Sequence, residues 1–138
     1  MTFMEKITVE AAVENLQQVV DFATEKLEER ECPMKAAMQL ELVIEEVFVN
    51  IASYAYQPDK GSATFCVDFE DEPEAVILTF IDSGKPYNPL EKPDPDLTLD
   101  LDEREIGGLG IFLVKKNVDE IFYERTGEKN ILRLKKFF

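Results

Sequence analysis

Two long segments near the N-terminus have apolar residues at helical spacing. In the first, apolar positions recur every three or four residues, and acidic residues such as Glu14 and Asp21 lie between them. The second runs from about Met34 to Tyr56, directly after Pro33, which disfavours helical geometry in the residue before it. The pattern predicts two helices with buried apolar stripes, and Leu42 and Val49 on the opposite side of the second indicate that it is covered from two directions. Their apolar stripes are Val13, Leu16, Val19, Val20, Ala23 and Leu27, and then Ala36, Leu40, Val43, Ile44, Val47, Ile51 and Ala55.

Five shorter segments have the character of strands. Residues 3–9 and 63–69 alternate between apolar and polar side chains, and residues 74–81 are apolar on both faces, as a central strand would be. Residues 120–126 and 130–138 form two last strands joined by a turn at Gly127, after a short amphipathic helix at 111–118. We therefore expect one domain, residues 1–138, with a sheet and helices packed together.

The regular pattern stops after Ile81 and resumes near residue 108. This interval holds four of the seven prolines and three of the six glycines. A long stretch without regular structure is uncommon in a compact domain and is often a functional lid. We expect a lid at about 85–107, and a tolerated insertion is the alternative. Lid residues Lys85, Lys92 and Arg104 are candidates for phosphate contacts, although surface lysines are usually only solvated.

The formal net charge of −14 restricts the kinds of partner that the protein can bind. Such a chain repels nucleic-acid backbones and anionic lipid, so we expect no direct nucleic-acid partner and no membrane partner. A bound polyphosphate would need a metal ion or aimed backbone amides. No segment approaches the roughly 20 apolar residues of a membrane span, so we expect a cytoplasmic protein.

The chain has no histidine, which excludes several kinds of active site. A Ser-His-Asp relay and an HExxH zinc site both require one. Any proton transfer must therefore fall to carboxylates, lysines or tyrosines. Glu46 and Asn50 are candidates for such a site, because they lie one turn apart on the flank of the apolar stripe of the second helix. The alternative is that both are ordinary solvated residues.

Glycines at 107–110 precede the short helix at 111–118. A helix N-terminus offers free N–H groups and a positive dipole end to anions, and glycine lets a ligand approach the backbone closely. The spacing matches neither a P-loop nor a dinucleotide-binding fingerprint. Taken alone, these residues are better explained as turn glycines than as a phosphate site.

The order of these motifs resembles the GHKL ATPase superfamily, which includes gyrase, histidine-kinase and mismatch-repair ATPase modules. Within it, the chain is similar to the bacterial anti-sigma factor serine/threonine kinases over nearly its whole length. The motifs that carry the resemblance are "EEVFVNIASYAY", "IDSGKPYNP", "GGLGIFLVKKNVDEI" and "NILRLKK". It implies a two-layer α/β (α+β) sandwich, in which a mixed, mostly antiparallel sheet carries its helices on one face.

The resemblance also implies roles for individual residues. Glu46 matches the catalytic carboxylate that acts as general base or orients the nucleophile, and Asn50 matches the residue that holds Mg²⁺ among the phosphates. Asp82 matches the carboxylate that accepts a hydrogen bond from the adenine amino group, and Gly84 the residue that lets the base lie close. The remaining nucleotide-binding positions are Gly108, Leu109 and Gly110 at the phosphates and Asn130 near the adenine.

The function implied is transfer of the γ-phosphoryl group of ATP, with ADP as product, to a STAS-domain anti-sigma factor antagonist. The kinase would otherwise bind a sigma factor and so regulate transcription, and the resemblance also suggests a homodimer. Two positions depart from the wider pattern: Pro86 replaces a glycine of the adenine motif, and Tyr54 stands where relatives often have histidine. The alternatives are a nucleotide-dependent interaction switch with weak or no kinase activity, and a catalytic fragment of a histidine kinase.

Overall fold

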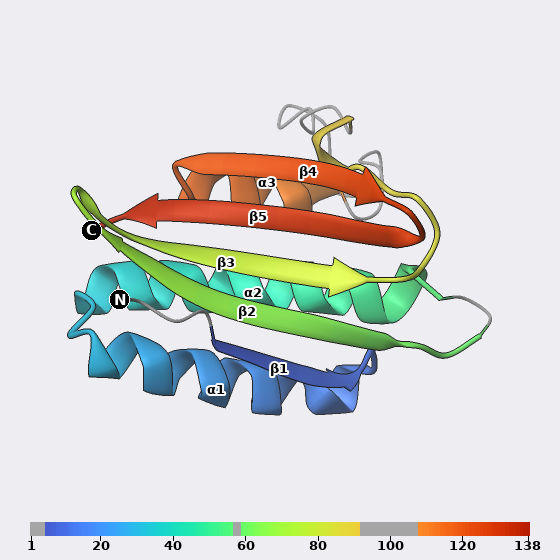
Figure 1. Cartoon of the computed structure of the whole chain (residues 1–138), viewed down its shortest axis with the longest axis horizontal. Helices are drawn as coiled ribbons and strands as arrows, with labels where there is room; N and C mark the ends of the chain where they lie inside the picture. Colours follow the sequence, from blue (N-terminus) through green and yellow to red (C-terminus); the bar gives the residue numbers. More distant parts are fainter. Residues whose placement is uncertain (1–4, 57–58, 92–107) are drawn as a thin grey trace.

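The computed structural model describes residues 5–56, 59–91 and 108–138, which form two layers (Figure 1). One layer is a five-stranded sheet with the order β1-β2-β3-β5-β4. The α-helices of the described residues form the other layer and lie on one face of the sheet. This confirms the expected α+β sandwich. The strands are β1 (Glu5–Glu10), β2 (Ser62–Asp71), β3 (Glu74–Asp82), β4 (Glu120–Thr126) and β5 (Lys129–Phe137), and the helices are η1 (Val13–Asn15), α1 (Leu16–Glu29), α2 (Met34–Tyr54), η2 (Pro89–Glu91) and α3 (Gly108–Asn117).

The four strand pairings are all antiparallel, so the described strands lack the parallel pair that a mixed sheet requires. The connections explain this difference from the expectation. Two helices, α1 and α2, join β1 to β2, and an even number of helices returns the chain in the opposite direction. A single helix, α3, joins β3 to β4, which therefore run the same way. Strand β5 lies between these two and separates them.

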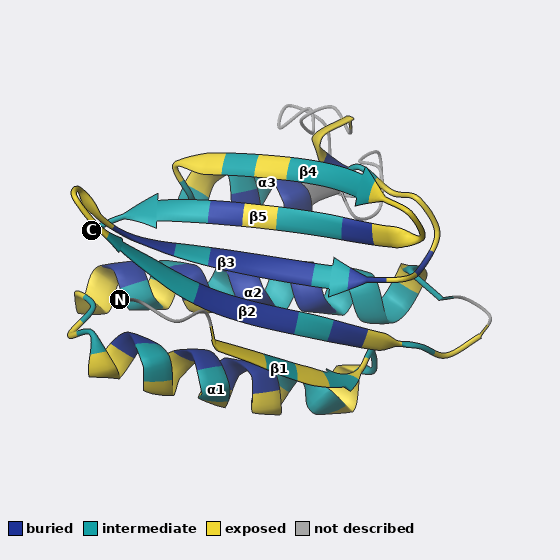
Figure 2. Cartoon of the chain, viewed as in Figure 1, coloured by how far each residue is buried: buried dark blue, intermediate teal, exposed yellow. Residues whose placement is uncertain are grey.

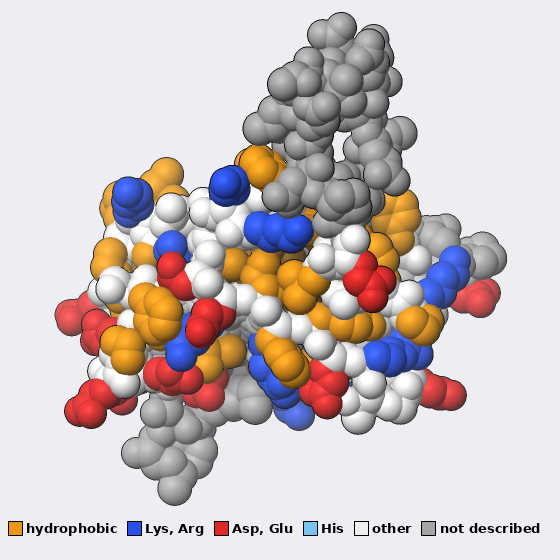
Figure 3. All heavy atoms as spheres, turned by 90° about the horizontal axis from the view of Figure 1, so that it is seen from above, with side chains coloured by type: hydrophobic (Ala, Val, Ile, Leu, Met, Phe, Trp, Pro, Cys, Tyr) orange, Lys and Arg blue, Asp and Glu red, His pale blue; other side chains and the backbone are white. Residues whose placement is uncertain are grey.

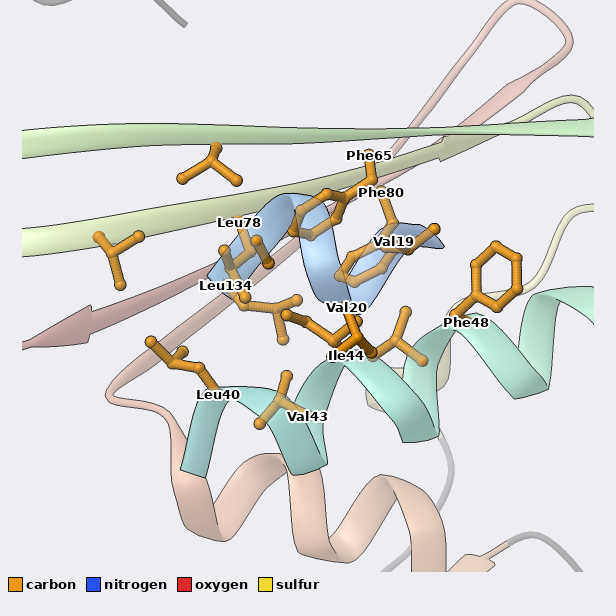
Figure 4. Packing of buried hydrophobic residues seen from close by; sticks show 14 of the residues in the cluster. Val19, Val20, Leu40, Val43, Ile44, Phe48, Phe65, Leu78, Phe80 and Leu134 are labelled. Atoms are coloured by element: carbon orange, nitrogen blue, oxygen red, sulfur yellow. The ribbon is translucent and has the colours of Figure 1, made fainter. Parts of the chain in front are cut away.

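The core fills the space between the sheet and the helices (Figure 4). Aliphatic side chains from α1 and α2 point toward aromatic side chains from β2 and β3. The rings of Phe65 and Phe80 lie 5.0 Å apart between centroids, and Phe22 meets Phe65 edge-on at 6.2 Å. Burial is densest in the central strands β2 and β3, while β1 and β4 at the sheet edges carry exposed positions (Figure 2). The central strand predicted at 74–81 is therefore confirmed.

The predicted helical stripes differ from the structure at their ends. Val13 belongs to η1 rather than to α1, and its side chain is 53% exposed. A 3₁₀ turn rotates three residues per turn, so it does not continue the buried face of the α-helix that follows. The second helix ends at Tyr54, two residues earlier than expected. None of the helices in the described ranges is long and apolar enough to cross a membrane.

Candidate functional site

Helix α2 places Glu46 and Asn50 in one pocket. Val43 and Val47 on the same helix are buried in the core, which fixes the rotation of α2 about its axis. Glu46 and Asn50 therefore emerge together at the flank, as their spacing predicts. The pocket measures about 150 Å³ and is lined by Glu46, Val49, Asn50, Ser53, Tyr54, Gly110 and Ile111. The neighbouring Glu45 is not part of the lining.

The first turn of α3 lies against the Glu46 carboxylate. Helix α3 begins at Gly108, so the sequence positions 108 to 110 form its N-terminal turn. A Cβ atom placed on Gly110 would lie 2.6 Å from Oε2 of Glu46. That distance is too short for a real contact, so Gly110 leaves the space that the carboxylate occupies. The structure thus brings two motifs together that are more than sixty residues apart in the sequence.

Asp82 ends strand β3 as a buried carboxylate, only 6% exposed. Its Oδ1 atom accepts hydrogen bonds from the backbone N–H of Gly84 and from Nδ2 of Asn130, each at 2.9 Å. Its Oδ2 atom has no hydrogen-bond partner among the residues that the structure describes. A buried carboxylate oxygen is costly to leave unpaired, so Oδ2 is suited to a ligand that donates a hydrogen bond.

A second, smaller pocket of about 40 Å³ lies beside Asp82. It shares Asn50 and Ile111 with the Glu46 pocket, so the two are neighbouring parts of one site. Its walls are mostly apolar and aromatic, with a few polar groups, as is usual for ligand-binding pockets. They are formed by Val47, Asn50, Ile51, Phe80, Asp82, Tyr87, Pro89, Ile111, Tyr123, Asn130 and Leu132.

The turn after β3 is hydrogen-bonded to the two residues that follow α2, Ala55 and Tyr56. A Cβ atom on Gly84 would lie 2.3 Å from the carbonyl oxygen of Ala55. Any side chain at this position would therefore collide with the backbone of Ala55, so the position requires glycine. The same carbonyl accepts a hydrogen bond from the N–H of Lys85 at 2.9 Å. The hydroxyl of Tyr56 accepts one from the N–H of Ser83 at 2.7 Å and donates to the carbonyl of Ser62 at 2.5 Å.

Asn130 lies opposite Asp82 in the β3–β5 register and is equally buried. Its Nδ2 donates to Asp82 and, at 2.7 Å, to the carbonyl of Lys85. Its Oδ1 accepts from the hydroxyl of Tyr123 at 2.5 Å and from the N–H of Tyr87 at 3.3 Å. The side chain expected near the adenine is therefore in the site, and its hydrogen-bonding groups are all engaged by the protein.

Three residues of the site were not singled out by the sequence analysis. Tyr123 and Arg125 belong to β4, and Arg125 donates from Nη1 to the carbonyl of Gly84 at 2.8 Å. Tyr56 joins α2 to the turn after β3. Alternation along β4 would place residues 123 and 125 on one face, but only the pairing of β4 with β5 brings them next to Asn130. Lys92 and Arg104, with most of the segment expected to be a lid, lie outside the described residues.

Two comparisons with known proteins show what this chain is similar to. The family model described as "Histidine kinase-like ATPase domain" matches residues 9–136. A curated relative, serine/threonine-protein kinase BtrW of Bordetella bronchiseptica, is 30% identical over 95 residues. That alignment covers 69% of this chain and 66% of the relative. The matched family range contains both pockets and all the site residues described above.

Proposed function

The chain belongs to the histidine kinase-like ATPase family, and we propose from this premise that it is an ATP-dependent protein serine/threonine kinase. The observation that carries the proposal is the placement of Glu46 and Asn50 in one pocket, next to the first turn of α3 and to the Asp82 pocket. Phosphoryl transfer is achieved mainly by positioning and electrostatics, and this arrangement puts a base, an oxygen ligand and a helix N-terminus side by side.

The smaller pocket would hold the adenine. Oδ2 of Asp82 is an acceptor, so it favours a base that presents an N–H donor, as the amino group of adenine does. The phosphates would then extend past Asn50 toward Gly108, Leu109 and Gly110, where α3 begins. A helix N-terminus offers N–H donors to anions, which matters in a chain with a net charge of −14.

The residues fit a magnesium ion that arrives with the nucleotide. The described residues contain no group of three or more acidic, cysteine or histidine side chains that could hold a metal without help. Mg²⁺ is commonly held by one or two protein groups together with phosphates and water. The Asn50 amide oxygen would supply one such group, and the ion would neutralise phosphate charge during transfer.

Glu46 would accept the proton of the attacking hydroxyl. Its carboxylate lies in the same pocket as Asn50 and against the turn of α3 that would face the phosphates. The hydroxyl of a protein serine or threonine that enters this pocket would therefore meet the base and the terminal phosphate together. Oxygen attack forms the new P–O bond, ADP leaves, and the proton goes to Glu46.

The partner we propose is a STAS-domain anti-sigma factor antagonist. The kinase name of the B. bronchiseptica relative supports the activity, and the motif resemblance supports the kind of substrate. In the same scheme, the unphosphorylated antagonist releases a sigma factor from this protein. A homodimer and a cytoplasmic location belong to this proposal as well.

Incubation with γ-labelled ATP, Mg²⁺ and candidate STAS proteins tests the proposal. We expect label on a serine or threonine of one STAS protein and none when Mg²⁺ is chelated. Binding of nucleotide and partner without any transfer would replace the kinase by a nucleotide-dependent switch. Pro86 is the residue that favours the nucleotide-dependent switch, because proline lacks the backbone N–H that a glycine would offer at this position.

A further inference from the structure

The amide orientation of Asn130 is set by backbone groups of unambiguous polarity. The carbonyl of Lys85 can only accept, so the atom 2.7 Å from it must be the NH₂ group. The N–H of Tyr87 can only donate, so the atom that faces it must be the amide oxygen. Nδ2 therefore also donates to Oδ1 of Asp82, and the Tyr123 hydroxyl donates to the amide oxygen.

This geometry uses every hydrogen-bonding position of the Asn130 amide. Two N–H groups and two lone pairs are available, and four protein groups engage them. Asn130 thus has nothing left to offer a nucleotide directly. It instead fixes Oδ1 of Asp82, together with the N–H of Gly84, and so determines where Oδ2 points.

We infer that Tyr123 and Asn130 are positioning residues that hold Asp82 in the orientation that reads the base. The inference rests on the proposed nucleotide site. Tyr123 has the greater influence of the two groups on the amide oxygen, because its hydrogen bond is 2.5 Å long and that of Tyr87 is 3.3 Å. Without the Tyr123 hydroxyl, the amide oxygen keeps only the longer hydrogen bond from the N–H of Tyr87, so the Asn130 amide is held less firmly. Asp82, which accepts a hydrogen bond from that amide, is then less firmly oriented toward the base.

The test compares ADP with inosine diphosphate, in which a carbonyl replaces the amino group of adenine. Each is titrated by calorimetry into the full-length parent protein and into Tyr123→Phe. We expect the parent to bind ADP more tightly by roughly 10-fold or more, because a hydrogen bond to a charged group is lost with inosine. In Tyr123→Phe the ADP affinity should fall by about 5- to 10-fold, which is the effect of one hydrogen bond between neutral groups. The affinity for inosine diphosphate should stay the same, so base selectivity is lost.

Thr8→Val is the matched control. It also removes a side-chain hydroxyl hydrogen bond from the sheet, to Thr64 at 2.8 Å, but at the opposite edge strand from β4. It should keep the parent selectivity. Asn130→Asp is a second variant, since it removes both amide donors and adds a charge beside Asp82. It should abolish ADP binding in a protein whose circular dichroism remains that of the parent.

The outcomes separate the inference from the proposed function. A parent that binds neither nucleotide contradicts the proposed ATP site and the inference with it. A selective parent with an equally selective Tyr123→Phe contradicts the inference alone. An equal loss of both affinities in Tyr123→Phe also contradicts it, because Tyr123 would then be only a wall of the pocket.

Discussion

At the scale of single residues, Gly110 gives the sharpest prediction. A Cβ atom there would lie 2.6 Å from Oε2 of Glu46, which is the mobile end of a long side chain. In Gly110→Ala the carboxylate should therefore move while the backbone stays in place. We expect the unfolding free energy to change by less than about 1 kcal/mol. Phosphoryl transfer should fall by about 10- to 100-fold, because a displacement of about 1 Å has that effect on a reacting group.

Gly84→Ala is the comparison for this variant. Its new Cβ would meet the backbone oxygen of Ala55 at 2.3 Å, which cannot give way as a side chain does. We expect a loss of about 1–3 kcal/mol in unfolding free energy, typical of overpacking. Urea denaturation and a transfer assay on both variants distinguish the two effects. A Gly110→Ala protein that transfers phosphate at the parent rate would show that catalysis does not depend on the present position of the Glu46 carboxylate.

The sequence was sufficient to predict that Glu46 and Asn50 lie together on one flank of α2. Helical spacing places Glu46 and Asn50 on one flank, and the buried stripe fixes which flank that is. Tyr123 and Arg125 could not be found in this way. Their role depends on the register of β4 with β5 and of β5 with β3, which is set by packing across the whole sheet.

At the scale of elements, the end of α2 and the turn after β3 behave as one unit. The Tyr56 hydroxyl joins them through the N–H of Ser83 and the carbonyl of Ser62. Tyr56→Phe removes both hydrogen bonds and keeps the ring beside Gly61. We expect a loss of about 1–3 kcal/mol in unfolding free energy. The midpoint of urea denaturation measures it.

Tyr54→Phe is the matched control for this prediction. Tyr54 is 57% exposed, and its hydroxyl makes no hydrogen bond within 5–56, 59–91 and 108–138. Its removal should leave the midpoint unchanged. Equal midpoints for Tyr56→Phe and the parent would mean that the turn after β3 is held without Tyr56.

The elements themselves were largely predictable, because the apolar periods differ between helix and strand. The structure differs from the prediction at places where the local sequence pattern does not determine the structure. Val13 fits the helical period but lies in a 3₁₀ turn. The absence of a parallel pair among the described strands follows from the insertion of β5 between β3 and β4, which no local pattern reveals.

At the scale of the whole molecule, the net charge opposes nucleotide binding. Charged groups of both signs are interspersed with hydrophobic ones on the face shown in Figure 3. A polyphosphate must therefore be favoured by local groups, and we expect Mg²⁺ together with ATP or ADP to stabilise the fold. A ligand at 100 times its Kd should add about 2.7 kcal/mol to the unfolding free energy. A thermal melt at millimolar nucleotide measures the shift.

Asp82→Asn is the control for this stabilisation. Because Oδ1 accepts two hydrogen bonds from the protein, an asparagine there keeps its oxygen in that place and turns its NH₂ group toward the base. The NH₂ group of the asparagine and the amino group of the adenine, both donors, then face each other, and most of the nucleotide-induced shift in melting temperature should disappear. An equal shift in Asp82→Asn would mean that the nucleotide does not bind beside Asp82.

The most direct test of the central claim is phosphate transfer by Glu46→Gln, measured alongside its ATP affinity. Glutamine keeps the size and helix propensity of glutamate but cannot accept the proton of the attacking hydroxyl. We predict transfer to a STAS partner slowed by about 10²- to 10⁴-fold, with ATP affinity little changed. Glu45→Gln, outside the pocket, should transfer at the parent rate. Glu46→Gln with the parent's rate of transfer would contradict the assignment of Glu46 as the catalytic base.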